Sequence, residues 1–154
     1  MRSALALLAA VSIASFAACS SEPAGGPPAA GAAVARITTS GGPVKLRVAI
    51  ADTEAARERG LQGVTDLAAD GGMAFLFDSP TRTGFWMKDT PTPLSIAFWG
   101  PDGRIVAMRN MAPCPADPCP TYRSAAPFVG ALEANRGFFA GHGVRVGDRV
   151  AIVR

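Results

Sequence analysis

Two carboxylates are the side chains in this sequence that could most readily do chemistry. Glu133 lies in the otherwise apolar segment Phe128–Ala134, where a charged group needs a partner. A structural ion pair with an arginine such as Arg57 is the simpler interpretation. The alternative makes Asp89 and Glu133 candidates for the acid/base pair of a glycosidase, which cleaves a glycan between two carboxyl groups. Their separation in the sequence leaves open whether they meet.

The segment Trp86–Thr90 is a candidate binding surface. A sugar or peptide could stack on the Trp86 ring and contact Lys88, Asp89 and Thr90 beside it. Arg57 is a further binding candidate. The simpler interpretation places Trp86 in the core and makes Asp89 a turn residue. Lys88 and Asp89 would face opposite sides of an extended backbone, so no ion pair between them is implied.

The cysteines favour a structural role over a metal site. Cys114 and Cys119 are expected to form a disulfide in an oxidising compartment, which would contribute about 2 kcal/mol. A redox pair usually has two intervening residues, whereas this pair has four, two of them prolines. His142, expected on an exposed turn between two glycines, is the only histidine, so we expect neither a zinc site nor another cofactor.

The N-terminal residues predict a targeting segment. Residues 1–18 predict a signal peptide, because Arg2 precedes the apolar run Ala4–Phe16, which is too short to span a bilayer comfortably. Small residues then lead to Cys19, which resembles the cleavage site of a bacterial lipoprotein. The resemblance implies acylation of Cys19 and a lipid bilayer as partner. An ordinary secretory signal is the alternative.

The expected location is the periplasmic face of the cell envelope. Residues 19–34 are low in complexity and nearly uncharged, which predicts a flexible tether. Ser20, in place of aspartate, favours the outer membrane by resemblance to sorted lipoproteins, where the organism has one. The net charge of +3 comes from scattered basic residues rather than a dense run, so nucleic acid is not an expected partner.

Residues 35–154 are expected to form one mainly β domain. The 17 glycines and 13 prolines favour short strands joined by tight turns. We expect a compact sandwich or barrel of about seven to nine short strands with one or two short helices. The expected strands are Ala35–Thr39, Val44–Ala51, Met73–Phe77, Leu94–Trp99, Arg104–Met111, Phe128–Ala134, Val144–Val146 and Arg149–Val153.

Two helical turns and an aromatic core complete the expected domain. Glu54–Arg59 predicts a short helix, capped by Asp52 or Thr53 at its start, and a further helical turn is expected around Phe138–Phe139. Residues 78–84 predict a polar loop. The stretch Gly71–Trp99 contains both tryptophans and four of the eight phenylalanines, so we place the core there.

Seven segments form an ordered set of matches to one family pattern. They are Arg57–Leu61, Gly72–Phe77, Phe85–Thr90, Pro93–Phe98, Asp102–Ile105, Leu132–Glu133 and Val146–Val150. Together they resemble the domain-of-unknown-function 192 family of bacteria and archaea. The resemblance covers about Val44–Val153 and implies a mainly β fold, often exported, with no established activity. This sequence departs from the family pattern at Gln62, where methionine is usual, at Asp89, where asparagine is usual, and at Ser95, where aspartate is usual.

Two functions remain open at this level. The first is a non-catalytic envelope lipoprotein that binds an envelope protein or a small molecule on the Trp86–Thr90 surface. The second is a small hydrolase that acts on envelope glycan through Asp89 and Glu133. We favour the binding module. The sequence also has no serine in a nucleophile-elbow pattern and no glycine-rich phosphate loop after a strand.

Overall fold

The computed structural model describes residues 33–154. The expected signal peptide, Cys19 and most of the expected tether lie outside the described residues. The described part forms one seven-stranded sheet with two short helices, which confirms the mainly β class. The elements are β1 (Ala33–Thr39), β2 (Gly42–Ala51), α1 (Glu54–Arg59), β3 (Gly71–Thr81), β4 (Leu94–Trp99), β5 (Ile105–Met111), β6 (Phe128–Asn135), α2 (Phe138–Gly141) and β7 (Arg149–Val153).

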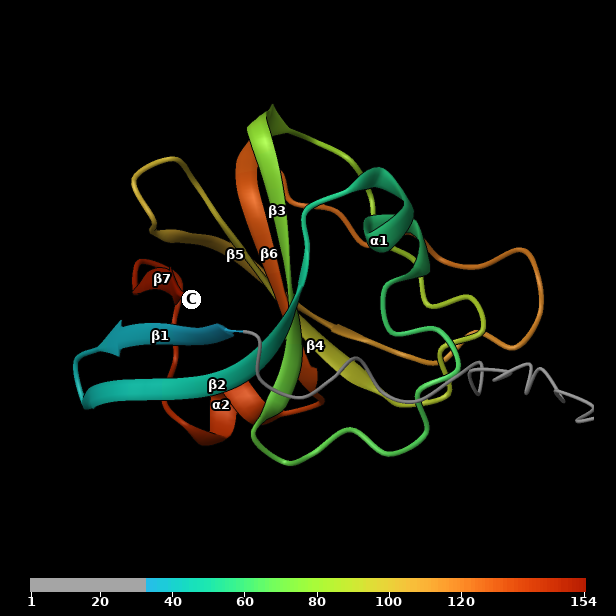
Figure 1. Ribbon diagram of the computed structural model, residues 1–154, viewed down its shortest axis with the longest axis horizontal. Helices are drawn as coiled ribbons and strands as arrows, with labels where there is room; N and C mark the ends of the chain where they lie inside the picture. The colour runs from blue at the N-terminus through green and yellow to red at the C-terminus, as the bar shows by residue number, and fades with distance from the viewer. Residues whose placement is uncertain (1–32) are drawn as a thin grey trace, which may run out of the picture.

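The sheet curls into a half-barrel with the strand order β5-β4-β6-β3-β2-β1-β7 (Figure 1). Neighbouring strands are antiparallel, except that β2 and β3 run parallel. A parallel pair needs a crossover connection, and α1 lies in that connection. Figure 1 shows α1 beside the sheet, on the side opposite the tip of the β1–β2 hairpin. Neither helix of the described part is long and apolar enough to cross a bilayer.

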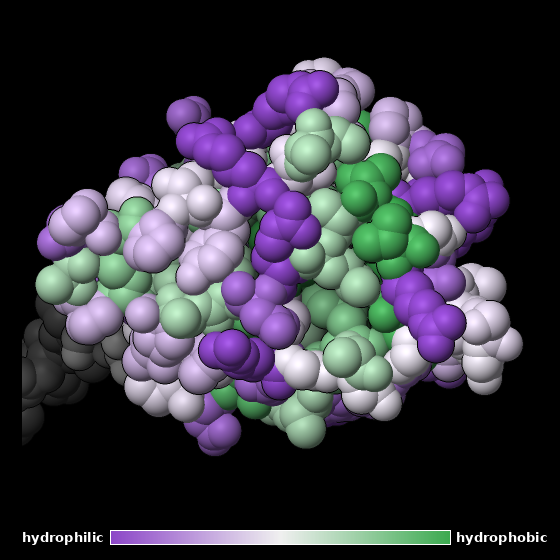
Figure 2. Space-filling model, turned by 180° about the vertical axis from the view of Figure 1, so that it is seen from behind, coloured by the Kyte–Doolittle hydropathy of each residue, from purple (hydrophilic) through white to green (hydrophobic). Residues whose placement is uncertain are grey.

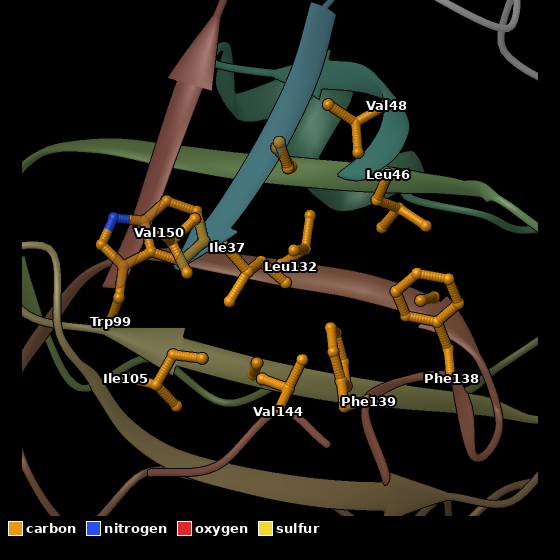
Figure 3. Packing of buried hydrophobic residues seen from close by; sticks show 14 of the residues in the cluster. Ile37, Leu46, Val48, Trp99, Ile105, Leu132, Phe138, Phe139, Val144 and Val150 are labelled. Carbon is orange, nitrogen blue, oxygen red and sulfur yellow. The ribbon is translucent and has the colours of Figure 1, made fainter. Parts of the chain in front are cut away.

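One face of the sheet carries an aliphatic-rich core. Ile37, Leu46 and Leu132 lie there with no exposed surface, and Phe139 of α2 packs against the same cluster. Figure 3 shows these side chains together with Trp99, which is 6% exposed. Burial of Trp99 confirms part of the expected core.

The opposite face carries the aromatic core. Phe75, Phe98 and Phe128 come from β3, β4 and β6, and each is at most 2% exposed. Leu61 and Met87, from the connections that follow α1 and β3, cover these rings. The alternation of side chains along each strand therefore divides the aromatic stretch between two faces. This second face holds the candidate site.

The helix α1 has the bounds that the sequence predicts. Thr53 caps it, since its side-chain oxygen accepts a hydrogen bond from the backbone N–H of Ala56 at 3.2 Å. Glu54 lies in the first turn, and Arg57 and Arg59 lie in the last turn, as the helix dipole favours. No residue of α1 is fully buried, so its contacts with the sheet must hold it in place.

Three expectations about the elements need correction. β1 begins at Ala33, two residues earlier than expected, and β3 continues to Thr81 through the expected polar loop. Thr81 still pairs with Phe128 of β6 beyond an irregularity in the register. Residues 144–146 form no strand. The Val144 N–H donates to the Phe139 carbonyl at 2.9 Å, and β7, which pairs with β1 on one edge, bonds on its other edge to Gly103, whose carbonyl accepts from the Val150 N–H at 2.8 Å. Val144 instead contributes its side chain to the aliphatic-rich core.

Candidate functional site

A groove of about 320 Å³ opens on the aromatic face of the sheet. We call it the Glu133 groove. Its walls come from α1 and the residues just after it, from β3, from the segment that follows β3, and from the start of β4. Glu133 of β6 contributes the buried acidic group of the lining. The lining residues are Glu54, Arg57–Gln62, Phe75, Phe77, Thr83–Met87, Thr90, Leu94 and Glu133.

Glu133 lies in the middle of the sheet. Its backbone pairs with Met73 of β3 on one side and with Ile96 of β4 on the other. Directly opposed residues share a face, so the Glu133 side chain points to the aromatic side with these two. The residue is only 4% exposed, and burial raises the pKa of its carboxyl from 4.5 to about 8. Near neutral pH the group is therefore mostly protonated.

The Glu133 carboxyl group has no partner among residues 33–154. No hydrogen bond or salt bridge of the described chain involves its side chain. Every side-chain oxygen or nitrogen that is fully enclosed within this part of the chain does have a hydrogen-bond partner. The Glu133 oxygens are therefore not sealed off, and they retain access to the space of the groove that they line.

Arg57 does not pair with Glu133, which corrects the simpler interpretation of the sequence. One guanidinium nitrogen of Arg57 donates hydrogen bonds to the backbone carbonyls of Asp52, at 2.7 Å, and Leu76, at 2.8 Å. The guanidinium carbon also lies 5.0 Å from the centre of the Phe77 ring. Arg57 thus joins α1 to β3 and forms part of the groove wall.

Aromatic rings surround the inner part of the groove. Phe75 and Phe85 meet edge to face with ring centres 5.0 Å apart. Phe85 also contacts Phe98, with centres 5.6 Å apart. Such pairs fix the position of the walls, because each ring restricts the rotamer of the next. The lining therefore combines rigid apolar walls with one buried acid.

Trp86 lies outside the core, which corrects the interpretation that buries it. It is 49% exposed, although Phe85 and Met87 on either side of it are buried. Its ring lines the mouth of the groove, and the Lys88 ammonium lies 5.9 Å from its centre. Lys88 also pairs with Asp117, which raises the Lys88 pKa. The exposed ring that the alternative interpretation requires is therefore present, and its role in binding stays a prediction.

The other residues of the expected binding surface divide between two places. Thr90 is buried and lines the groove. Asp89 is exposed, has a positive φ of 53°, and accepts a hydrogen bond from the N–H of Gly63 through its carbonyl at 2.8 Å. Asp89 and Lys88 are not part of the groove lining. The structure thus does not bring Asp89 into the groove with Glu133.

Cys114 and Cys119 form a disulfide, as expected. The ring that it closes contains Asp117, the partner of Lys88. The Cys114 N–H donates a hydrogen bond to the Met87 carbonyl at 3.2 Å, so the disulfide loop supports the groove wall from behind. His142 is exposed at the end of α2, as expected. No cluster of acidic, histidine and cysteine side chains within residues 33–154 could hold a metal ion.

The sequence interpretation missed most of the α1 wall. Glu58 and Arg59 line the groove, and so does Gln62, one of the three departures from the family pattern. Ser95, another departure, lies elsewhere: its hydroxyl donates to Asn110 and accepts from the Gly137 N–H. The sequence did contain a signal for the α1 wall, because the family match Arg57–Leu61 covers most of the residues that form it.

The rest of the described surface is mixed in character. On the face seen in Figure 2, a band of hydrophilic side chains runs beside groups of hydrophobic ones. Among the described residues, the large hydrophobic side chains that are exposed are Trp86, Val146 and Val153. Trp86 is the aromatic one of the three, and it is the one that borders the groove.

Comparisons with known proteins agree with this fold. Residues 35–152 match the family DUF192, described as "Uncharacterized ACR, COG1430". A Novosphingobium aromaticivorans DSM 12444 protein of unknown function is 31% identical, with a TM-score of 0.74 over 91% of this chain and 99% of its own. A Sinorhizobium meliloti 1021 protein described as a "putative transcription regulator" is 33% identical, with a TM-score of 0.71 over 77% of this chain and 92% of its own. No curated protein matches the chain.

Proposed function

The chain belongs to DUF192, a family of uncharacterised proteins. From the geometry of the Glu133 groove, we propose that it is a binding module for a small organic ligand. The ligand would occupy the Glu133 groove. The observation that carries the proposal is the Glu133 carboxyl group, which is 4% exposed, has no partner among residues 33–154 and opens into about 320 Å³ of space. A buried polar group is costly unless something hydrogen-bonds to it, and a ligand can fulfil that role.

The size and composition of the groove support this proposal. Small-molecule sites are concave, about 300 to 1,000 Å³ in volume, mainly apolar, and equipped with a few polar groups that orient the ligand. Phe75, Phe85, Met87 and Leu94 supply apolar walls here. Trp86 at the mouth adds an exposed ring on which a planar or apolar part of a ligand can stack.

The same geometry gives less support to a hydrolase. Glycosidases place two carboxyl groups on opposite sides of the bond that they cleave, about 5 to 10 Å apart. Asp89, the second carboxylate considered from the sequence, is exposed and does not line the groove. The other carboxylates of the lining, Glu54 and Glu58, are exposed on α1. We therefore retain the non-catalytic role.

Nuclear magnetic resonance tests the binding proposal directly. The ¹⁵N-labelled full-length chain is titrated with a library of small amines, amides, alcohols and carboxylic acids. We expect at least one class to shift the backbone amide signals of Gly84, Phe85 and Thr90, while those of Ala35 and Val150, on the other side of the sheet, stay in place. Shifts confined to remote amides, or no saturable shift with any class, would contradict the proposal.

We also propose that the module is held at the cell envelope by acylation of Cys19, which the sequence alone supports. Several acyl chains, at about 0.8 kcal/mol per buried methylene, would anchor it stably. The wild-type chain, expressed in a bacterium that processes lipoproteins, should partition into the detergent phase of a cloud-point extraction. Cys19→Ser should move it to the aqueous phase, and Ser20→Ala should not. Equal partition of wild type and Cys19→Ser would argue against the anchor.

A further inference from the structure

Building on the proposed ligand-binding function, we infer that the ligand of the Glu133 groove carries an organic ammonium group that pairs with the Glu133 carboxylate. The inference starts from the place of this acid. Glu133 projects from a central strand between Met73 and Ile96, towards a groove walled by aromatic rings. A buried acid that faces open space without a cation of its own is complementary to a cation brought by a ligand.

None of the nearby cations of the described chain pairs with Glu133, and two of them are engaged elsewhere. Arg57 is bound to two backbone carbonyls and lies over Phe77. Lys88 pairs with Asp117 outside the groove. Arg59, in the last turn of α1, is exposed. The Glu133 carboxyl can therefore pair with a positive group supplied by a ligand.

The walls also favour an ammonium ion over other groups. Aromatic rings attract cations through the negative charge of their faces, and Phe75 and Phe85 line the groove in addition to Phe77, which already contacts Arg57. A carboxylate ligand would place a second acid beside a buried one, which is unfavourable. A neutral amide could accept a hydrogen bond from protonated Glu133, and the experiment below distinguishes that case.

Binding of an ammonium ion requires one proton to leave. In the free protein the Glu133 carboxyl is mostly protonated near neutral pH, because burial raises its pKa to about 8. When the ammonium ion enters, the carboxyl releases this proton to solvent and the charged pair forms. The other charged groups that line the groove, Glu54, Arg57, Glu58 and Arg59, all belong to α1. Glu133 is the one buried acid among the lining residues, so the released proton is assigned to it.

Calorimetry with three matched probes tests the inference on the full-length chain. The probes are 2-phenylethylamine, the neutral 2-phenylethanol, and 3-phenylpropanoate. We expect the amine to bind at least about tenfold more tightly than either of the others at about pH 8, with its affinity rising about tenfold per pH unit between about pH 6 and 7.5. Titrations in two buffers of different ionisation enthalpy should show close to one proton released per amine bound at about pH 7.

Two variants complete the test. Glu133→Gln should abolish the preference for the amine and its pH dependence, while Asp78→Asn, which neutralises an exposed carboxylate outside the groove, should change neither. Equal affinities for amine and alcohol, or pH-independent binding without proton release in the wild type, would overturn the inference. If the alcohol or an amide still binds in the groove, the proposed function survives. If no probe binds and the amide signals of the groove do not shift, the proposed function fails as well.

Discussion

The two tryptophans show how the role of one residue type depends on its place in the fold. Trp99 ends β4 and packs against Gly130 of the neighbouring strand, where an added Cβ atom would lie 2.0 Å from the indole ring. Trp86 stands between two buried residues and is 49% exposed. Gly130 makes room for the Trp99 ring, whereas the Trp86 ring has solvent on one side. Only Trp86 is free to contact a ligand.

Alanine substitutions should separate these roles. Trp99→Ala should lower the free energy of unfolding by about 3 to 5 kcal/mol, because it leaves a large cavity in the aliphatic-rich core. Trp86→Ala should lower it by less than about 1 kcal/mol, because the side chain is half exposed. Urea unfolding followed by circular dichroism measures both values. Equal losses for the two variants would mean that Trp86 has a structural role.

At the residue scale, the sequence identified Glu133 as an unusual buried acid, but not that it has no partner among residues 33–154. Glu133 was recognisable because a charge in an apolar strand is costly. Its pairing with Arg57 could not be judged from the sequence, because backbone carbonyls can also accept hydrogen bonds from a guanidinium. In the structure Arg57 donates to the backbone carbonyls of Asp52 and Leu76, and Glu133 faces the groove without it. Which acceptor an arginine binds depends on the groups near it in space, and spacing along the chain does not show which groups those are.

At the element scale, α1 depends on Arg57. The helix has only six residues and no fully buried side chain, so its own hydrogen bonds cannot keep it folded. Arg57→Ala should lower the free energy of unfolding by about 1 to 3 kcal/mol, through the loss of two hydrogen bonds and the contact with Phe77. Arg59→Ala, in the same turn but exposed, should cost less than about 0.5 kcal/mol.

Thermal or urea unfolding of the two arginine variants provides the measurement. The expected outcome is a clear loss for Arg57→Ala and almost none for Arg59→Ala. If both variants match the wild type, Arg57 does not hold α1 on the sheet. The groove wall would then need another support, such as the Leu61 side chain, which packs into the aromatic core.

The disulfide loop is a second support for the groove. Replacing both Cys114 and Cys119 with alanine should lower the free energy of unfolding by about 2 kcal/mol, the value for such a short ring. Chemical denaturation of this variant, beside wild type with and without a thiol reductant, measures the loss. The wild type in reductant should behave like the variant. A double variant as stable as the oxidised wild type would show that the loop is held by its other contacts.

Most strands could be predicted because their cause is local. Alternating side chains in β2 and an apolar run in β4 are visible in the sequence, and both strands were found close to their expected bounds. The segment 144–146 has an equally suitable composition but forms no strand. Contacts with distant segments decide this, because β7 pairs with β1 on one edge and with the residues around Arg104 on the other. Pairing between distant strands cannot be inferred from one segment alone.

At the scale of the whole molecule, the sheet separates two cores that serve different purposes. The aliphatic-rich face is closed by α2 and Val144 (Figure 3). The aromatic face is closed only in part, because α1 and the connections around β3 leave the Glu133 groove open between them. The curl of the half-barrel lets one sheet provide both a closed core and an open groove. In the proposed function, one face supplies most of the stability and the other contacts the ligand.

The position of Glu133 at the centre of the sheet couples its proton to global stability. Folding raises its pKa from 4.5 to about 8, so between these values the folded chain keeps a proton that the unfolded chain releases. The unfolded state then binds fewer protons, and the free energy of unfolding falls as the pH rises through this window, by about 1.4 kcal/mol per unit at most. Urea titrations at about pH 5 and 8 should show a decrease of several kcal/mol in wild type and in Asp78→Asn, but little in Glu133→Gln. A wild type that is equally stable at both values would mean that the acid is already charged and partnered when folded.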